Sequence, residues 1–193
     1  MENLINDLIQ RTHNVLNEAE ALKELPKGNL QWRPAAESWS VLECIEHLNR
    51  YGRYYIPEIK QRMKGAAPAK PGQAFKTGLL GNYFAKAMLP KEKLNTMKTF
   101  SNMNPLLSNL EKETIEEFIQ QQKQLLQILD DCRKVDLNKT KTSISISKLI
   151  KLKLGDTLRV VIYHNQRHLV QAHKVLREFE AFSKQKARQA HTI

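Results

Sequence analysis

The stretch GDTLRVVIYHNQRHLVQAHKVLREFE, residues Gly155–Glu180, decides the fold of this chain. At 100° per residue its apolar side chains fall on a single stripe, which predicts an amphipathic helix with one face against a core. Asp156 is placed to cap that helix, with Gly155 before it. The stripe consists of Leu158, Val161, Ile162, Asn165, Leu169, Ala172, Leu176 and Phe179.

Two histidines lie on the flank of this stripe. His164 and His168 are four residues apart, so their side chains are one helical turn apart and can point at a single ion. Two ligands alone make a weak site. A catalytic zinc or nickel site usually has three protein ligands and one open position, so a third histidine is needed from elsewhere in the chain.

The composition favours one all-α domain. The chain has 193 residues with only 7 Gly and 7 Pro, and good helix formers dominate it. We expect a domain over residues 1–182, followed by a basic, frayed tail over 183–193 in which His191 is not a ligand.

Nothing in the sequence indicates secretion or a membrane span. Cys44 and Cys132 both lie in helical patterns beside apolar residues, which argues against a disulfide framework. The N-terminus carries Glu2 and Asp7 and lacks the pattern of a signal peptide. No stretch approaches the roughly 18 apolar residues of a spanning helix. We therefore expect a cytoplasmic protein without a membrane partner.

The formal net charge of +11 is unevenly distributed. Residues 60–100 carry +8 and residues 132–193 carry +10, so the excess lies in two inter-helix segments and the C-terminal end. Solvated surface charge explains this distribution. The alternative is a nucleic-acid-associated module, whose binding would depend steeply on salt.

Apolar residues at helical spacing predict a first helix over residues 2–24, ended by Pro26, Gly28 and Asn29. His13 lies on it without a ligand-like partner nearby and is not expected to bind metal. The apolar positions are Leu4, Ile5, Leu8, Ile9, Thr12, Val15, Leu16, Ala19 and Leu22.

A second long helix is predicted to begin after Ser40, which forms a capping box with Glu43. Pro57 falls inside this helix and should bend or break it. Trp32 and Trp39 precede it and are interpreted as core anchors; the alternative is a wall of the active-site pocket, which fits Trp39 better than Trp32. The buried stripe is Val41, Ile45, Leu48, Tyr55, Ile59 and Met63.

His47 lies on the flank of this second stripe, one turn from Cys44 and one turn from Tyr51. If the second helix packs beside the last one, His47, His164 and His168 can converge. Spacing alone leaves two interpretations open: three structural histidines, or a metal site.

Two long links separate the predicted helices. Residues 65–108 contain one short helical candidate around residues 78–88, and a link of this length crosses the bundle or covers a functional site. Pro105 leads into a third helix that extends to Asp131. We interpret residues 132–154 as a loop, because a lone extended segment at Ser143–Ser147 has nothing to pair with.

The segments WSVLECIEHL (39–48) and GDTLRVVIYHNQRHLVQA (155–172) together resemble the DinB/YfiT-like superfamily of bacterial metalloproteins, which is unrelated to the DNA polymerase that shares part of the name. The resemblance implies a four-helix bundle with up-down-down-up connectivity and long crossovers. It also implies that His47, His164 and His168 are metal ligands for nickel or zinc. Better understood members are transferases or isomerases that act with low-molecular-weight thiols such as bacillithiol or mycothiol.

This resemblance predicts a metal-dependent enzyme with a small-molecule substrate, most simply an S-transferase. A metal with an open position lowers the pKa of a thiol or of water, so a hydrolase is the alternative. Non-enzymatic alternatives are the nucleic-acid module and a homodimeric interaction protein with structural histidines. We expect the protein to form a homodimer also if it is an enzyme. Candidates for orienting the histidines or lining the pocket are Tyr51, Glu43, Glu46, Asn165, Arg167 and Gln171.

Overall fold

The structure is a computed structural model that describes residues 1–90 and 98–190. Helices dominate it and the strands form one small sheet, which confirms the all-α prediction. In chain order the elements are α1 (Glu2–Glu24), α2 (Lys27–Gln31), α3 (Val41–Met63), α4 (Leu79–Met88), η1 (Ser101–Met103), α5 (Glu113–Asp131), η2 (Cys132–Lys134), β1 (Lys141–Ile144), β2 (Ser147–Lys153) and α6 (Leu154–Ala190).

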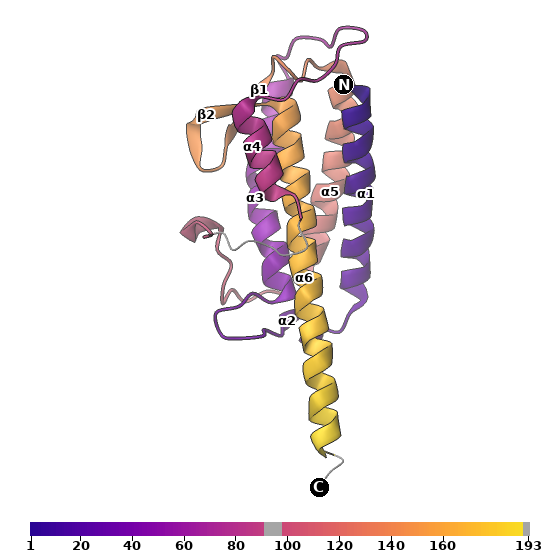
Figure 1. Ribbon diagram of the computed structural model, residues 1–193, viewed down its shortest axis with the longest axis vertical. Coiled ribbons are helices and arrows are strands. Elements are labelled where there is room, and N and C mark those ends of the chain that lie inside the picture. The colour runs from indigo at the N-terminus through magenta and orange to yellow at the C-terminus, as the bar shows by residue number, and fades with distance from the viewer. Residues whose placement is uncertain (91–97, 191–193) are drawn as a thin grey trace.

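The four longest of these helices lie side by side (Figure 1). Both α1 and α3 contact α5 and α6. Hydrogen bonds between α3 and α5 join Arg53 to Glu117 and, seven residues further along both helices, Lys60 to Gln124. Between α1 and α6, Arg11 bonds to Gln166 and, again seven residues further along both helices, Glu18 bonds to His173. Hence α3 runs parallel to α5, and α1 runs parallel to α6. These directions are those that an up-down-down-up bundle requires.

The core consists of two apolar clusters, each with residues from all four long helices. One cluster includes Ile59 of α3 and Leu158 of α6, and the other includes Ile45 and Leu169 of the same two helices. The predicted stripes supply both clusters, because apolar side chains at helical spacing are removed from water on one face. On α6, His164 and His168 lie in the sequence between Tyr163 of the first cluster and Leu169 of the second. On α3, His47 lies between Ile45 and Leu48 of the second cluster.

The start of α3 is fixed as the sequence predicts. The Ser40 hydroxyl accepts a hydrogen bond from the Glu43 backbone N–H at 3.2 Å, and the Glu43 carboxylate accepts one from the Ser40 backbone N–H at 2.8 Å. This capping box satisfies two backbone donors that the helix cannot. Pro57 is exposed within α3, and the helix continues through it to Met63, so the alternative of a break there is wrong.

Both links differ from the sequence interpretation. The short helix expected around residues 78–88 is present as α4, but α5 begins at Glu113 rather than directly after Pro105. Residues 132–154 are not a loop, because β1 pairs antiparallel with β2. The expectation that an extended segment here would have no partner is wrong, because residues 147–153 form the second strand. The Tyr54 hydroxyl donates to the carbonyl oxygen of Ile144 at 3.0 Å, which attaches the hairpin to α3.

The last helix is longer than predicted. It begins at Leu154, so Asp156 lies within its first turn instead of capping it, and the Asp156 carboxylate accepts hydrogen bonds from Thr77 and from the Gly78 backbone. The residues expected to fray are helical as far as Ala190, and this end of α6 extends past the other helices (Figure 1). His191 lies outside the described residues. Within residues 1–90 and 98–190, no helix is both long and apolar enough to cross a membrane.

Candidate metal centre

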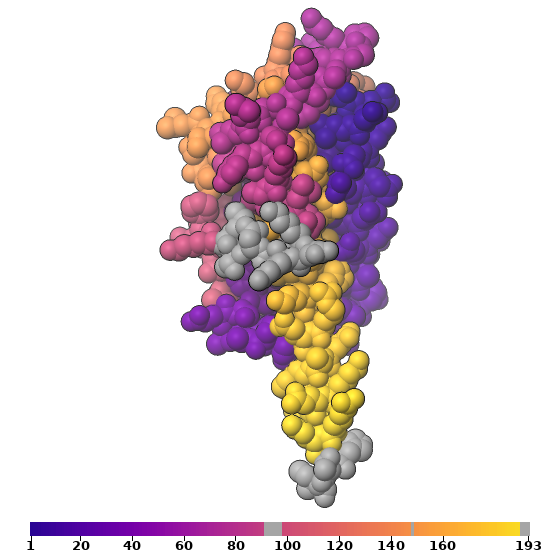
Figure 2. Space-filling view, viewed as in Figure 1, coloured from indigo at the N-terminus to yellow at the C-terminus, as the bar shows by residue number. Residues whose placement is uncertain are grey.

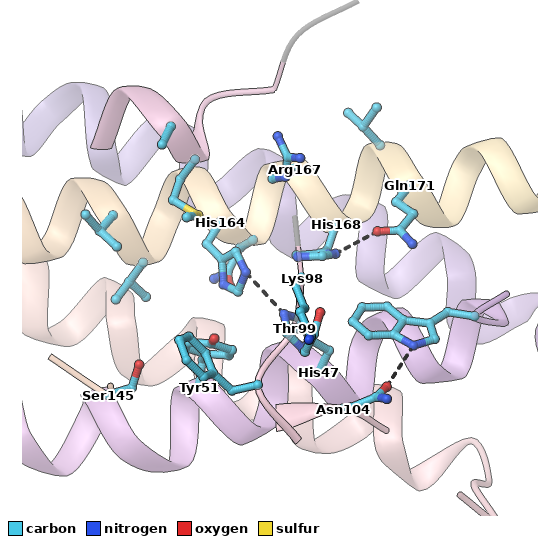
Figure 3. Close-up of a pocket in the computed structure, with 18 of the residues that line it drawn as sticks. His47, Tyr51, Lys98, Thr99, Asn104, Ser145, His164, Arg167, His168 and Gln171 are labelled. Carbon is cyan, nitrogen blue, oxygen red and sulfur yellow. Dashed lines mark hydrogen bonds between the residues drawn. The ribbon is translucent and has the colours of Figure 1, made fainter. Parts of the chain in front are cut away.

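Three histidines converge where α3 packs against α6 (Figure 3). Nε2 of His47 lies 3.3 Å from Nε2 of His164. The ring centroid of His168 is 4.5 Å from that of His47 and 4.6 Å from that of His164. One ligand atom from each residue lies within 4.8 Å of the others, and all three side chains are buried. The structure therefore brings together the three histidines singled out in the sequence.

Hydrogen bonds on the outer side fix the tautomers of two of these rings. Nδ1 of His47 lies 2.7 Å from the carbonyl oxygen of Met103, which can only accept, so Nδ1 carries the proton. Nδ1 of His168 likewise donates to Oε1 of Gln171 at 2.9 Å. The Nε2 atoms of both rings are left with lone pairs available for a cation, an arrangement typical of metal-binding histidines.

Burial keeps the three imidazoles neutral. It lowers the pKa of His47 to about 4, with a smaller contribution from the positive charge of Arg50. Burial also places the pKa values of His164 and His168 well below the usual range, and the neighbouring histidines and Arg167 add to the effect. Neutral imidazole is the form that coordinates metal, so no proton has to be displaced near pH 7.

The spacing of two of the donors fits a shared divalent cation. Two imidazole nitrogens bound at about 2.0–2.1 Å in tetrahedral geometry lie roughly 3.3–3.4 Å apart. The observed separation of 3.3 Å between the Nε2 atoms of His47 and His164 agrees with that value. Nitrogen donors suit nickel and zinc rather than calcium or magnesium. His47, His164 and His168 could thus hold a metal ion.

A cavity of about 1420 Å³ opens over the histidines. Trp39 stacks at a tilt against His47, with ring centroids 4.7 Å apart, and its indole N–H donates to Oδ1 of Asn104 at 3.1 Å. Tyr51 meets the ring of His164 edge-on at 4.6 Å. Both aromatic residues line the cavity, so the pocket-wall alternative for Trp39 describes its position, while Trp32 packs against Phe179 away from the site.

The other candidates divide into two groups. Tyr51, Asn165 and Arg167 line the cavity, and Gln171 bonds directly to His168. Asn165 also donates to Oε1 of Gln122 at 3.0 Å. Glu43 and Glu46 do not contact the histidines. Among their described contacts, Glu43 binds Arg33 and the backbone of Ser40 and Leu107, and Glu46 pairs with Arg50 and Arg53.

Two other described histidines lie apart from the site, one of them His13, which was not expected to bind metal. His13 is exposed on α1. His173 contacts Glu18 of α1 at 3.0 Å, on the opposite side of α6 from the site.

Cys44 and Cys132 are buried free thiols, and burial raises both pKa values, that of Cys132 to about 12.

Sequence reasoning missed the residues that the crossover segment brings to the site. The backbone carbonyl of Met103 orients His47, and Asn104 holds Trp39. Any residue type supplies a backbone carbonyl, so no pattern could have indicated Met103. Ser145 from the hairpin also lines the cavity and was hidden by the interpretation of residues 132–154 as a loop.

The fold and the site together define a class: a helical protein with a three-histidine centre between two of its long helices. The chain matches the family model of the DinB superfamily over residues 8–172, a range that includes all three histidines. It belongs to the DinB superfamily. No curated protein and no solved structure matches the chain.

Proposed function

We propose that this protein is a metal-dependent transferase that joins a low-molecular-weight thiol to an electrophilic small molecule. One observation carries the proposal: three buried, neutral imidazoles face one another at the wall of a large cavity. A structural metal site is usually closed by a fourth protein ligand, whereas a catalytic site keeps a position open. Among the described residues, the group of possible ligands contains only these three.

In this proposal His47, His164 and His168 hold nickel or zinc. The bound cation would lower the pKa of a substrate thiol, so that the thiolate is available near neutral pH. Met103 and Gln171 keep two of the imidazoles in the correct tautomer and orientation through their hydrogen bonds. Trp39 and Tyr51 pack against the rings and limit their movement.

The transfer itself is a nucleophilic substitution. The thiol sulfur provides the electron pair for a new bond to the electrophilic carbon, and the bond from that carbon to its leaving group breaks with its own pair. The thiol proton passes to water. Lys98 and Lys174 line the cavity and favour an anionic or zwitterionic thiol through their positive charge.

The test combines metal analysis with an activity assay. Protein purified without a histidine tag should contain about one nickel or zinc ion per chain. Bacillithiol, glutathione and cysteine are then assayed against a generic electrophile with metal-loaded and chelated protein. Faster transfer by the metal-loaded form for at least one thiol supports the proposal. Equal rates for every thiol would reject the transferase and leave the hydrolase as the next activity to assay.

A further inference from the structure

The cavity extends in both directions along α6 from the histidines. Because a helix rises about 1.5 Å per residue, Val160 lies roughly 6 Å to one side of His164, and Arg177 lies roughly 13 Å to the other side of His168. Val160 and Arg177 both line the cavity. The chemical character of the wall differs between these two directions.

On the side of Val160 the wall is apolar. We call this part the apolar compartment; residues of α4, the β1–β2 hairpin and the first turns of α6 line it. These elements lie next to one another in Figure 1, and Figure 2 shows α4 beside the hairpin on the surface. Its described lining contains no charged side chain, and the hydroxyl groups of Tyr55 and Ser145 lie within hydrogen-bond distance of each other. The main lining residues are Tyr55, Phe84, Met88, Ile144, Leu152 and Val160.

On the side of Arg177 the wall is polar and carries both signs of charge. Lys174 and Arg177 face this part of the cavity together with Glu37 and Glu178. Such a wall suits a zwitterionic molecule, because each charge on it finds an opposite partner. The histidines lie between the two parts, so molecules bound on either side would meet there.

The walls of the apolar compartment are held in place by partly buried hydrogen bonds between neighbouring elements. The Asp156 carboxylate binds Thr77 and the backbone N–H of Gly78 at the start of α4. Arg159 of α6 donates to Asn82 of α4 at 3.2 Å. The hairpin is attached to α3 through Tyr54, as described above. The compartment is therefore formed before any ligand binds, as small-molecule sites usually are.

We propose that the apolar compartment binds an uncharged aromatic group of the electrophilic substrate. This inference rests on the proposed function and names its second substrate class. Tyr83 and Ile146 line the compartment yet are 67% and 48% exposed. Binding of an apolar ligand would remove this apolar surface from water, which is favourable. Aromatic rings add favourable edge contacts with Phe84 and the tyrosines. A charged group is disfavoured, because no described side chain there would compensate its desolvation.

The test is a fluorescence titration of the metal-loaded full chain with the uncharged naphthalene dye Prodan. Val160→Asn places an amide in the apolar compartment, and its dissociation constant for the dye should rise about tenfold. Val170→Asn is the matched control, since it makes the same change on the same helix on the other side of the histidines, and it should shift the constant less than about twofold. Equal weakening in both variants, or none in either, would overturn the inference.

A second variant protects the test against a folding defect. Phe84→Ser changes the α4 wall instead of α6 and should weaken the dye to a similar extent, while both variants keep their metal content and helical circular dichroism. The dye reports on the compartment independently of catalysis. Selective loss of dye binding without any thiol transfer would reject the proposed function but keep the aryl site. Thiol transfer together with unselective dye binding would reject this inference alone.

Discussion

Two groups of buried polar side chains on α6 differ in how their hydrogen bonds are satisfied. Asp156, in the first turn, is fully buried, and its carboxylate binds Thr77, Gly78 and Arg159 of the same chain. His164 and His168 are also buried, yet the site-facing nitrogens of the histidine cluster point at one another. Burial of a polar group therefore does not identify a functional site. Nitrogen atoms directed at a common point are better evidence, because the contact described for the site-facing nitrogens of His47 and His164 is with each other.

The largest expected effect is the loss of metal binding. His47→Ala and His168→Ala should each abolish stoichiometric binding, with affinity reduced by more than about 100-fold, because two imidazoles make a weak site. Metal content by mass spectrometry and titration calorimetry measure this effect. His173→Ala removes a histidine of the same helix that contacts Glu18 and should bind metal normally. Full affinity in His47→Ala would disprove the three-histidine centre.

Substitution of Asp156 should affect stability and leave metal binding intact. Asp156→Ala leaves the partners of a buried carboxylate unsatisfied and should lower the free energy of unfolding by about 3 kcal/mol, with metal affinity of the folded protein unchanged. Urea denaturation provides the measurement. Asp7→Ala breaks the exposed pair with Arg11 and should cost less than about 1 kcal/mol. If Asp156→Ala weakened metal binding without lowering stability, Asp156 would not have the purely structural role assigned to it.

Glu43 extends the comparison to α3. Burial acts to raise its pKa, but hydrogen bonds from Arg33, Ser40 and Leu107 outweigh it, and the pKa is lowered overall. Because the folded pKa lies below the unfolded one, the stabilisation is present above about pH 4.5 and is lost as the pH falls through the folded pKa. Glu43→Gln should therefore cost about 2 kcal/mol at pH 7.

Denaturation at a series of pH values tests this prediction about Glu43. The difference between Glu43→Gln and the unmodified protein should shrink as the solution becomes more acidic than pH 4.5. A difference that stays constant down to pH 3 would show that the Glu43 charge does not stabilise the start of α3.

The smallest effect concerns the hydrogen bond behind the metal centre. Gln171→Leu removes the acceptor for Nδ1 of His168 and should weaken metal binding about tenfold while His168 remains a ligand. Gln166→Leu makes the same change on α6 at a residue that instead accepts from Arg11, and its metal affinity should be unaltered. Equal affinities in the two variants would mean that Gln171 does not orient His168.

Local sequence patterns determined most of the helices and placed each of the three histidines on the flank of an apolar stripe. The period of the apolar residues predicted α1, α3 and α6, and the Ser40 and Glu43 pair located the start of α3. These signals are readable because a helix joins residues three and four apart. The same rule placed His164 and His168 one turn apart. The flank position of His47 allowed it to join them only if the two helices pack side by side, a contact that spans 117 residues, and the family resemblance favoured a shared metal over three structural histidines.

The remaining features depend on contacts between distant segments. The pairing of β1 with β2, the late start of α5 at Glu113 and the carbonyl of Met103 at His47 carry no local signature. The cavity is also a product of tertiary structure, because α4, the hairpin and α6 form its walls together. Sequence by itself determined which side chains could bind a metal. Packing decided that their nitrogens meet, which hydrogen bonds orient them and what kind of cavity they face.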